Sequence, residues 1–127
     1  MDNDPGWTIS GGQWAWGVPA GLSGDPAAGH TRTNVYGYNL SGNYASSIPE
    51  YYLTTTPISC LNLTQVTAKF WRWLGVEQAA YDHARFQVSN NGTAWTTVWE
   101  NPSGVGNNIN ESAWSQQSYD ISAVASH

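Results

Sequence analysis

The stretch QVTAKFWRWL, residues 65–74, decides the fold class of this chain. Its side chains alternate with a period of two, which is typical of a β-strand. Because the more polar face also carries two tryptophans, we expect a central strand that is covered on both sides at its C-terminal half. One predicted face holds Val66, Ala68, Phe70 and Leu74, and the other holds Thr67, Lys69, Trp71 and Trp73.

Downstream of this strand, a second alternating segment predicts a β-hairpin. Apolar and polar residues alternate over 84–88, and a further β-prone segment covers 95–99. Between them, Asn91-Gly92 supplies the positive φ angles that a tight hairpin needs. Residues 116–121 predict a last strand, followed by at most one helical turn at 122–125.

Upstream, residues 1–50 carry Gly or Pro every few positions, so we expect loops with short strands there. No segment shows the periodicity of a longer helix. Short strands separated by turn signals predict an all-β protein, an antiparallel β-sandwich. With no linker or repeat in the sequence, residues 1–127 are expected to form a single domain.

Composition excludes several classes of partner. Only 10% of the 127 residues are charged and the net charge is -5, so Asn, Ser, Thr, Gln and Gly must cover the surface, as in extracellular β proteins. The only cations are Arg32, Lys69, Arg72 and Arg85, which argues against nucleic acid and anionic membranes as partners. No apolar run is long enough for membrane insertion. We therefore expect an extracellular or secreted protein.

Several blocks of the sequence, taken together, resemble a jelly-roll β-sandwich module of the MAM and galactose-binding-like type. Such modules are found appended to secreted bacterial proteases and other exported proteins. The resemblance implies an antiparallel jelly roll and a role in binding or attachment, and it names no ligand. The blocks are GGQWAWG (11–17), DP (25–26) with NVYGYNL (34–40), YLTT (52–55), FWRWL (70–74), YDHA (81–84) and YDIS (119–122).

The resemblance also implies an incomplete sheet edge. Modules of this type continue past the position of Ile121 with one or two more strands, whereas this sequence stops at His127. An edge without its neighbour could pair with another copy and give a homo-oligomer or a filament. Cys60 is then either the remaining half of a disulfide or a buried free thiol.

Eight Trp, seven Tyr and two Phe are the outstanding feature of the composition. Flat rings stack on the apolar CH faces of sugars, while nearby amides satisfy the hydroxyl groups. The same rings also serve as core, as cross-strand pairs and as interface residues, so all these roles stay open. The candidate ligand-binding residues are loop aromatics and asparagines of the first half, namely Trp14, Trp16, Tyr36, Tyr38, Tyr44, Asn34, Asn39 and Asn43.

Calcium is the candidate cofactor, because it takes oxygen ligands of the kind that the resembling blocks contain. Asp25 and Asp82 are the candidate metal ligands. Asp25 could equally form a turn, and Asp82 could pair with a nearby arginine. Ser59 and Asn91 stand where we expect Asp in such modules, which counts against an intact family metal site.

We expect no catalysis. The three histidines, His30, His83 and His127, lie in no recognisable motif, and a single cysteine cannot build a four-ligand zinc site. The sequence therefore predicts a non-catalytic extracellular module whose ligand is carbohydrate or a cell-surface polymer. The alternative is a structural subunit that self-assembles through its incomplete sheet edge.

Overall fold

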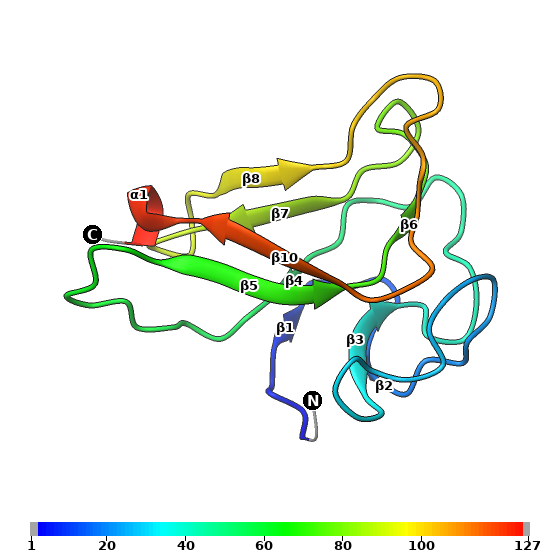
Figure 1. Ribbon diagram of the computed structural model, residues 1–127, viewed down its shortest axis with the longest axis horizontal. Helices are drawn as coiled ribbons and strands as arrows, with labels where there is room; N and C mark the ends of the chain where they lie inside the picture. The colour runs from blue at the N-terminus through cyan, green and yellow to red at the C-terminus, as the bar shows by residue number, and fades with distance from the viewer. Residues whose placement is uncertain (1–2, 126–127) are drawn as a thin grey trace. The chain divides into compact units, whose positions relative to one another are not determined.

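The computed structural model describes residues 3–125, which form short strands and one helical turn (Figure 1). All strand pairs in this part of the chain are antiparallel, so the expectation of a β-rich protein is confirmed. The chain divides into two compact units, Met1–Ile58 and Ser59–His127. The single-domain organisation stays a prediction. The end of the chain at His127 lies outside the described residues, and no described helix is long and apolar enough to cross a membrane.

The first unit contains two short strand pairs joined by long loops, as its Gly and Pro content predicts. Strand β1 (Thr8–Ile9) pairs with β4 (Leu53–Thr54). Strand β2 (Trp14–Gly17) pairs with β3 (Val35–Tyr38) along the full length of both strands. The β2–β3 ribbon is therefore the larger regular element of this unit.

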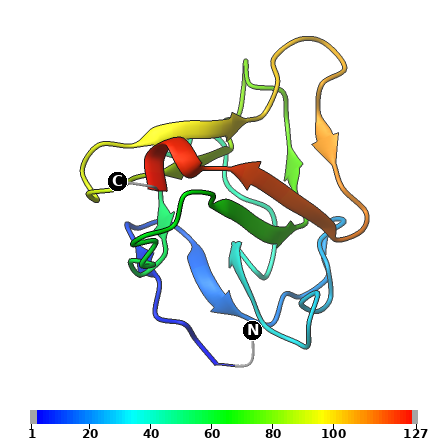
Figure 2. The same cartoon turned by 60° about the vertical axis from the view of Figure 1, so that its left-hand side comes forward.

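The second unit is built around two longer pairs. Strand β5 (Thr67–Arg72) pairs with β10 (Ser115–Asp120), and both views of the chain show them side by side (Figures 1 and 2). Strand β7 (Arg85–Val88) pairs with β8 (Thr96–Glu100), with a bulge at Phe86/Gln87. The predicted strands at 65–74, 84–88, 95–99 and 116–121 are thus confirmed.

Two minor elements complete the second unit. Strand β6 (Gly75–Val76) pairs with β9 (Ile109–Asn110), and the predicted final turn is α1 (Ser122–Ala125). In the part of the chain that the structure describes, each sheet consists of two strands. A jelly-roll arrangement of these pairs is therefore not itself established by the strand ladders.

The expectation that β5 is a central strand is wrong, and the expected cover of its second face is confirmed only at Trp73, which follows β5 and lies half-buried 5.8 Å from the Trp114 ring. Among the described residues β10 is its one ladder partner. Phe70 is half-buried, but Lys69 is exposed and Trp71 keeps 43% of its surface exposed. The cross-strand neighbours of these outward residues on β10 are also exposed and polar, so this face of the ribbon faces solvent.

The turn between β7 and β8 also differs from expectation. Within 90–93 only Gly92 has a positive φ, +74°, whereas the type I′ hairpin turn that Asn-Gly favours requires it at both central positions. Instead, Asn91 Oδ1 accepts hydrogen bonds from the N–H groups of Thr93 (2.9 Å) and Ala94 (2.8 Å). The asparagine side chain therefore organises a longer turn.

Packing in the second unit centres on three rings. Phe70 lies 5.0 Å from Phe86 and 6.1 Å from Tyr119 between ring centroids, and Phe86 lies 5.4 Å from Tyr119. The inner face of β5–β10 thus packs on β7. Cys60 is a half-buried free thiol, and because the sequence has a single cysteine both of its predicted interpretations stay open.

Candidate functional site

The β2–β3 ladder gathers four of the predicted ligand-binding residues on one face. Trp14 lies opposite Tyr38, and Trp16 lies opposite Tyr36. Because residues two apart on a strand point to the same side, all four rings share one face of the ribbon. The placement of these residues in loops was wrong, since all four lie within strands and are half-buried.

Two further rings extend this group. Trp7 stacks on Tyr36, with ring centroids 4.8 Å apart and planes 5° apart. Tyr51 stacks on Tyr38 at 6.3 Å and 21°, while Trp14 meets Tyr38 edge-on at 5.6 Å and 89°. We call this group the aromatic face; it comprises Trp7, Trp14, Trp16, Tyr36, Tyr38 and Tyr51.

The glycine pair before β2 makes this packing possible. A Cβ atom on Gly12 would lie 2.5 Å from Tyr51 Cδ2 and 2.6 Å from the Tyr38 hydroxyl oxygen. Gly12 also has a φ of +69°, a conformation that L side chains rarely adopt. Glycine is therefore required here both for the turn into β2 and for the close approach of the two tyrosine rings.

Tyr36 is held by polar contacts as well as by stacking. Its hydroxyl donates to Asp4 Oδ1 and accepts a hydrogen bond from Trp7 N–H at 3.0 Å. The hydrogen bond from Tyr36, followed by that from Gly6 N–H, lowers the pKa of Asp4. Burial and the bond to Asp4 raise the pKa of Tyr36. Residues 4–7 are thus fastened to one end of the aromatic face.

The two half-buried indoles differ in how their N–H groups are used. Trp14 Nε1 donates to the carbonyl oxygen of Tyr51 at 3.4 Å. Trp16 Nε1 is buried and has no hydrogen-bond partner among residues 3–125. A buried donor without a partner costs about 1–3 kcal/mol. The aromatic face therefore contains one buried donor that the described residues leave unsatisfied.

The predicted asparagines lie at the two ends of β3. Asn39 and Asn43 meet in the turn that follows the strand, where Asn39 Nδ2 donates to the Asn43 carbonyl oxygen at 2.6 Å. Tyr44 follows this turn and is 38% exposed. Asn34 precedes the strand and is half-buried. The structure thus brings Asn39 and Asn43 together and places Asn34 at the opposite end of the strand.

The predicted metal ligands lie in separate units. Asp25 closes a turn through its N–H, which donates to the Leu22 carbonyl oxygen at 3.0 Å, and burial raises its pKa. The carbonyl oxygen of Asp82 accepts a hydrogen bond from Asn101 Nδ2 at 2.9 Å. Within residues 3–125 no three His, Cys, Asp or Glu side chains gather as a metal-binding group. Calcium binding stays a prediction.

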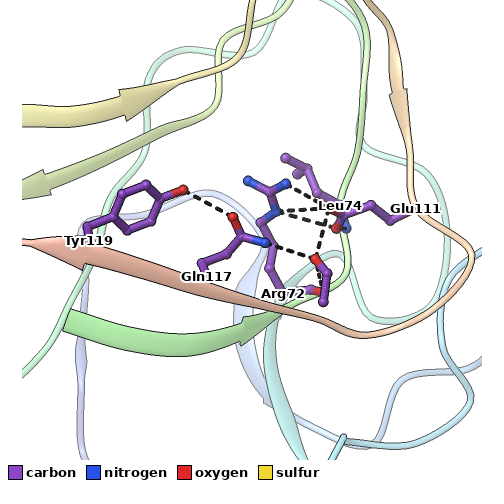
Figure 3. A network of polar contacts seen from close by, with 6 residues as sticks. Arg72, Leu74, Glu111, Gln117 and Tyr119 are labelled. Carbon is purple, nitrogen blue, oxygen red and sulfur yellow. Dashed lines mark hydrogen bonds and ion pairs between the residues drawn. The ribbon is translucent and has the colours of Figure 1, made fainter. Parts of the chain in front are cut away.

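A polar network in the second unit fastens the end of β5 (Figure 3). Arg72 Nη2 donates to Glu111 Oε1 at 2.6 Å, and Arg72 Nε contacts both carboxylate oxygens at 3.2 and 3.3 Å. Leu74 N–H donates to Glu111 Oε2 at 2.7 Å. The network continues from Ser115 to Gln117 and on to Tyr119.

The surroundings of Arg72 mark this network as structural. Only 19% of the Arg72 side chain and 17% of the Glu111 side chain are exposed. The guanidinium carbon lies 4.6 Å from the centre of the Trp99 ring, in a cation–π contact. Sequence analysis missed Glu111, although a cation on the inward face of a strand was a signal that an acidic partner had to exist.

Trp7 and Tyr51 belong to the aromatic face but were not among the predicted ligand-binding residues, for a different reason. Trp7 reaches Tyr36 across a large separation in sequence, and Tyr51 reaches Tyr38 from a loop. No local sequence pattern predicts either contact, because both depend on how the loops return to the β2–β3 ribbon. The aromatic content of the first 58 residues was the one available signal.

Taken together, antiparallel strand pairs, long loops and a half-exposed aromatic face define a small β-rich module. Its sequence is similar to a segment of Bacillopeptidase F from Bacillus subtilis (strain 168), with 33% identity over 120 residues. The alignment covers 93% of this chain and 8% of that protein. The chain therefore spans about 8% of the length of this relative. No model of a known protein family matches the chain, and no solved structure matches it.

The expected relationship to modules carried by bacterial proteases is confirmed at the level of this alignment. The relative is a peptidase by its name, and the aligned segment is a small part of it. The similarity covers 93% of the chain. It leaves the type of module and its ligand to be argued from the residues themselves.

Proposed function

We propose that this chain is an exported, non-catalytic accessory module that binds carbohydrate through the aromatic face. The observation that carries the proposal is the β2–β3 register, which aligns Trp14 and Trp16 with Tyr38 and Tyr36 on one half-exposed face. The proposed fold is an antiparallel jelly-roll β-sandwich of the galactose-binding-like type. Its strand pairs are antiparallel throughout the described residues, as that fold requires.

The chemistry of the aromatic face suits a sugar. Ring faces cover the apolar CH groups of a pyranose, and a few fixed polar groups orient it. The turn at Asn39 and Asn43 brings amide groups to the end of β3. Amide groups of this kind are suited to hydrogen-bond the hydroxyls of a sugar.

Export and an accessory role are supported by the comparison and the composition. The chain is similar to a small segment of a much longer peptidase, which fits a part that attaches or positions rather than the part that cleaves. Only 10% of its residues are charged, so uncharged residues make up most of its surface. We therefore propose attachment to a carbohydrate or cell-surface polymer as its task.

Glycan-array binding of the wild type, of Trp16→Phe and of a Trp14→Ala/Trp16→Ala double variant tests this function. Trp16→Phe keeps a ring but reduces the aromatic area, so we expect about tenfold weaker binding with the fold retained. The double variant should lose binding altogether. Trp95→Ala, an exposed tryptophan of the other unit, is the control. Unchanged binding by folded Trp16→Phe and by the double variant would remove the aromatic face from the site.

One observation favours self-assembly as a second candidate function. Each strand in the described residues has a single ladder partner, and an unpaired strand edge is a template for another chain. Light scattering with calcium and with a chelator separates the candidates. A binding module stays at the monomer mass and binds ligand saturably, whereas an assembling subunit grows in mass without ligand.

A further inference from the structure

The two faces of the β5–β10 ribbon in the second unit differ sharply in chemistry. On the inner face, Phe70 and Tyr119 contact each other and the ring of Phe86. The outer face carries the alternate residues of both strands, and every one of them is exposed. We call this set the outer face of the β5–β10 ribbon; it comprises Thr67, Lys69, Trp71, Gln116, Ser118 and Asp120.

One large ring stands among the polar groups of the outer face. Trp71 is 43% exposed and lies directly opposite Gln116 in the ladder, while Lys69 lies opposite Ser118. The hydrophobic packing of the ribbon is carried by its inner face, to which Trp71 does not belong. An exposed indole beside an amide and a hydroxyl is therefore placed where its exposed part can contact a ligand.

From this arrangement we infer that the outer face of the β5–β10 ribbon is a second carbohydrate-binding surface, and that its ligand is a neutral polysaccharide chain. The indole of Trp71 stacks on a sugar ring, and the side chains of Gln116 and Ser118 hydrogen-bond its hydroxyls. This surface lies on a different ribbon from the aromatic face, so it does not depend on the site proposed for that face.

Charge and shape select this ligand class. Lys69 and Asp120 balance each other, so the outer face carries no net charge, and the whole chain at -5 repels acidic polymers. The carboxylate of Asp120 is also hydrogen-bonded to the first residue of α1. It accepts hydrogen bonds from the N–H and the hydroxyl of Ser122 at 2.9 and 2.6 Å. Six paired residues give a strip about 20 Å long, which suits an extended chain better than a single sugar.

Retention on insoluble neutral polysaccharides tests the inference. The probes are cellulose, chitin and xylan, and the variants are Trp71→Ala, Trp71→Tyr and Gln116→Ala. Trp95→Ala is the matched control, because Trp95 is 44% exposed in the same unit but outside the outer face. We expect Trp71→Ala to weaken retention about tenfold and Trp71→Tyr to restore most of it, since a flat ring is what stacks.

The outcomes separate this inference from the function proposed for the aromatic face. Equal retention of Trp71→Ala and Trp95→Ala overturns the second surface and leaves the aromatic face untouched. Loss in Trp71→Ala with normal retention of the folded Trp14→Ala/Trp16→Ala variant supports the outer face and rejects the aromatic face. Failure of the wild type to bind any of the three polymers overturns the inference. Binding that tracks an added protein instead makes the outer face a protein-docking surface, which also overturns it.

Discussion

The carboxylate of Glu111 holds the side chain of Arg72 and the backbone of Leu74 at the same time. Its Oε1 accepts Arg72 Nη2 at 2.6 Å, and its Oε2 accepts the N–H of Leu74 at 2.7 Å. The backbone N–H of Glu111 in turn donates to the Leu74 carbonyl oxygen at 2.9 Å. One acidic residue thus ties the end of β5 to the segment that leads into β10.

Replacing this carboxylate should destabilise the second unit. Glu111→Gln keeps the shape but leaves the largely buried charge of Arg72 without a counter-charge. We expect a loss of about 2–3 kcal/mol in the free energy of unfolding, measured in urea. Glu100→Gln is the control, because its contacts with His83 and Arg85 are half-exposed and should be worth below about 1 kcal/mol. Equal effects of the two variants would show that burial of the Arg72 pair is unimportant.

The free energy of unfolding should also depend on pH through the carboxyl group of Glu111. Burial alone raises the pKa of Glu111, but hydrogen bonds from Arg72, Leu74 N–H and Ser115, with the positive charge of Arg72, outweigh burial and hold it below 4.5. Because the pKa of Glu111 is lower in the folded state, its stabilisation is complete above pH 4.5. The stabilisation is lost as the pH falls through the pKa of Glu111 in the folded protein. Urea unfolding between neutral pH and pH 3 should show a smaller acid loss in Glu111→Gln than in the wild type. Parallel curves would contradict this assignment.

Asn101 is expected to be the polar residue whose loss costs most. It is 2% exposed, its Nδ2 donates to the carbonyl oxygens of Glu77 and Asp82, and its Oδ1 accepts Ala84 N–H. Asn101→Ala leaves these three backbone groups without their partner, so we expect a loss of about 2–4 kcal/mol. The fall in melting temperature on thermal unfolding measures this loss of stability.

The control for that substitution is Asn107→Ala. Asn107 is exposed, and its amide donates to the nearby Ser103 carbonyl oxygen at 2.7 Å. Removing it should cost less than about 1 kcal/mol. A similar fall in melting temperature for both variants would mean that the loops between 77 and 108 are not held by Asn101.

A pair of glycines with the same backbone angle tests the packing of the aromatic face. Gly6 and Gly12 have φ angles of +70° and +69°, but only Gly12 faces rings, those of Tyr38 and Tyr51. Gly6→Ala should cost about 1 kcal/mol in backbone strain alone. Gly12→Ala should cost about 1–3 kcal/mol more and alter the near-ultraviolet circular dichroism of the stacked rings. Identical spectra and stabilities would place the rings elsewhere.

Alternation along the chain was enough to predict the main strands. The period of two in residues 65–74 and 84–88 reports which side chains share a face, and the ladders of β5 and β7 agree with it. It could not say whether either face is covered, since that depends on neighbouring elements. For this reason Trp71 was expected inside and lies on an exposed face.

The residue types of the candidate site could be predicted from the sequence, but their arrangement in space could not. Trp14, Trp16, Tyr36 and Tyr38 were named from their residue types, and the β2–β3 register then placed them on one face. The stacking of Trp7 on Tyr36 and the pairing of Arg72 with Glu111 join segments that are distant in sequence. Such contacts arise from the return path of loops, which no local pattern encodes.

The central claim is that this chain attaches to a carbohydrate polymer as an individual module. A depletion isotherm on insoluble cellulose, chitin and xylan tests it most directly, with the bound and free protein measured over a wide concentration range. The account predicts saturable binding of the wild type to at least one polymer, weakened in Trp16→Phe and in Trp71→Ala and unchanged in Trp95→Ala. Absence of depletion on all three polymers, in protein whose solution mass grows with concentration, would contradict it.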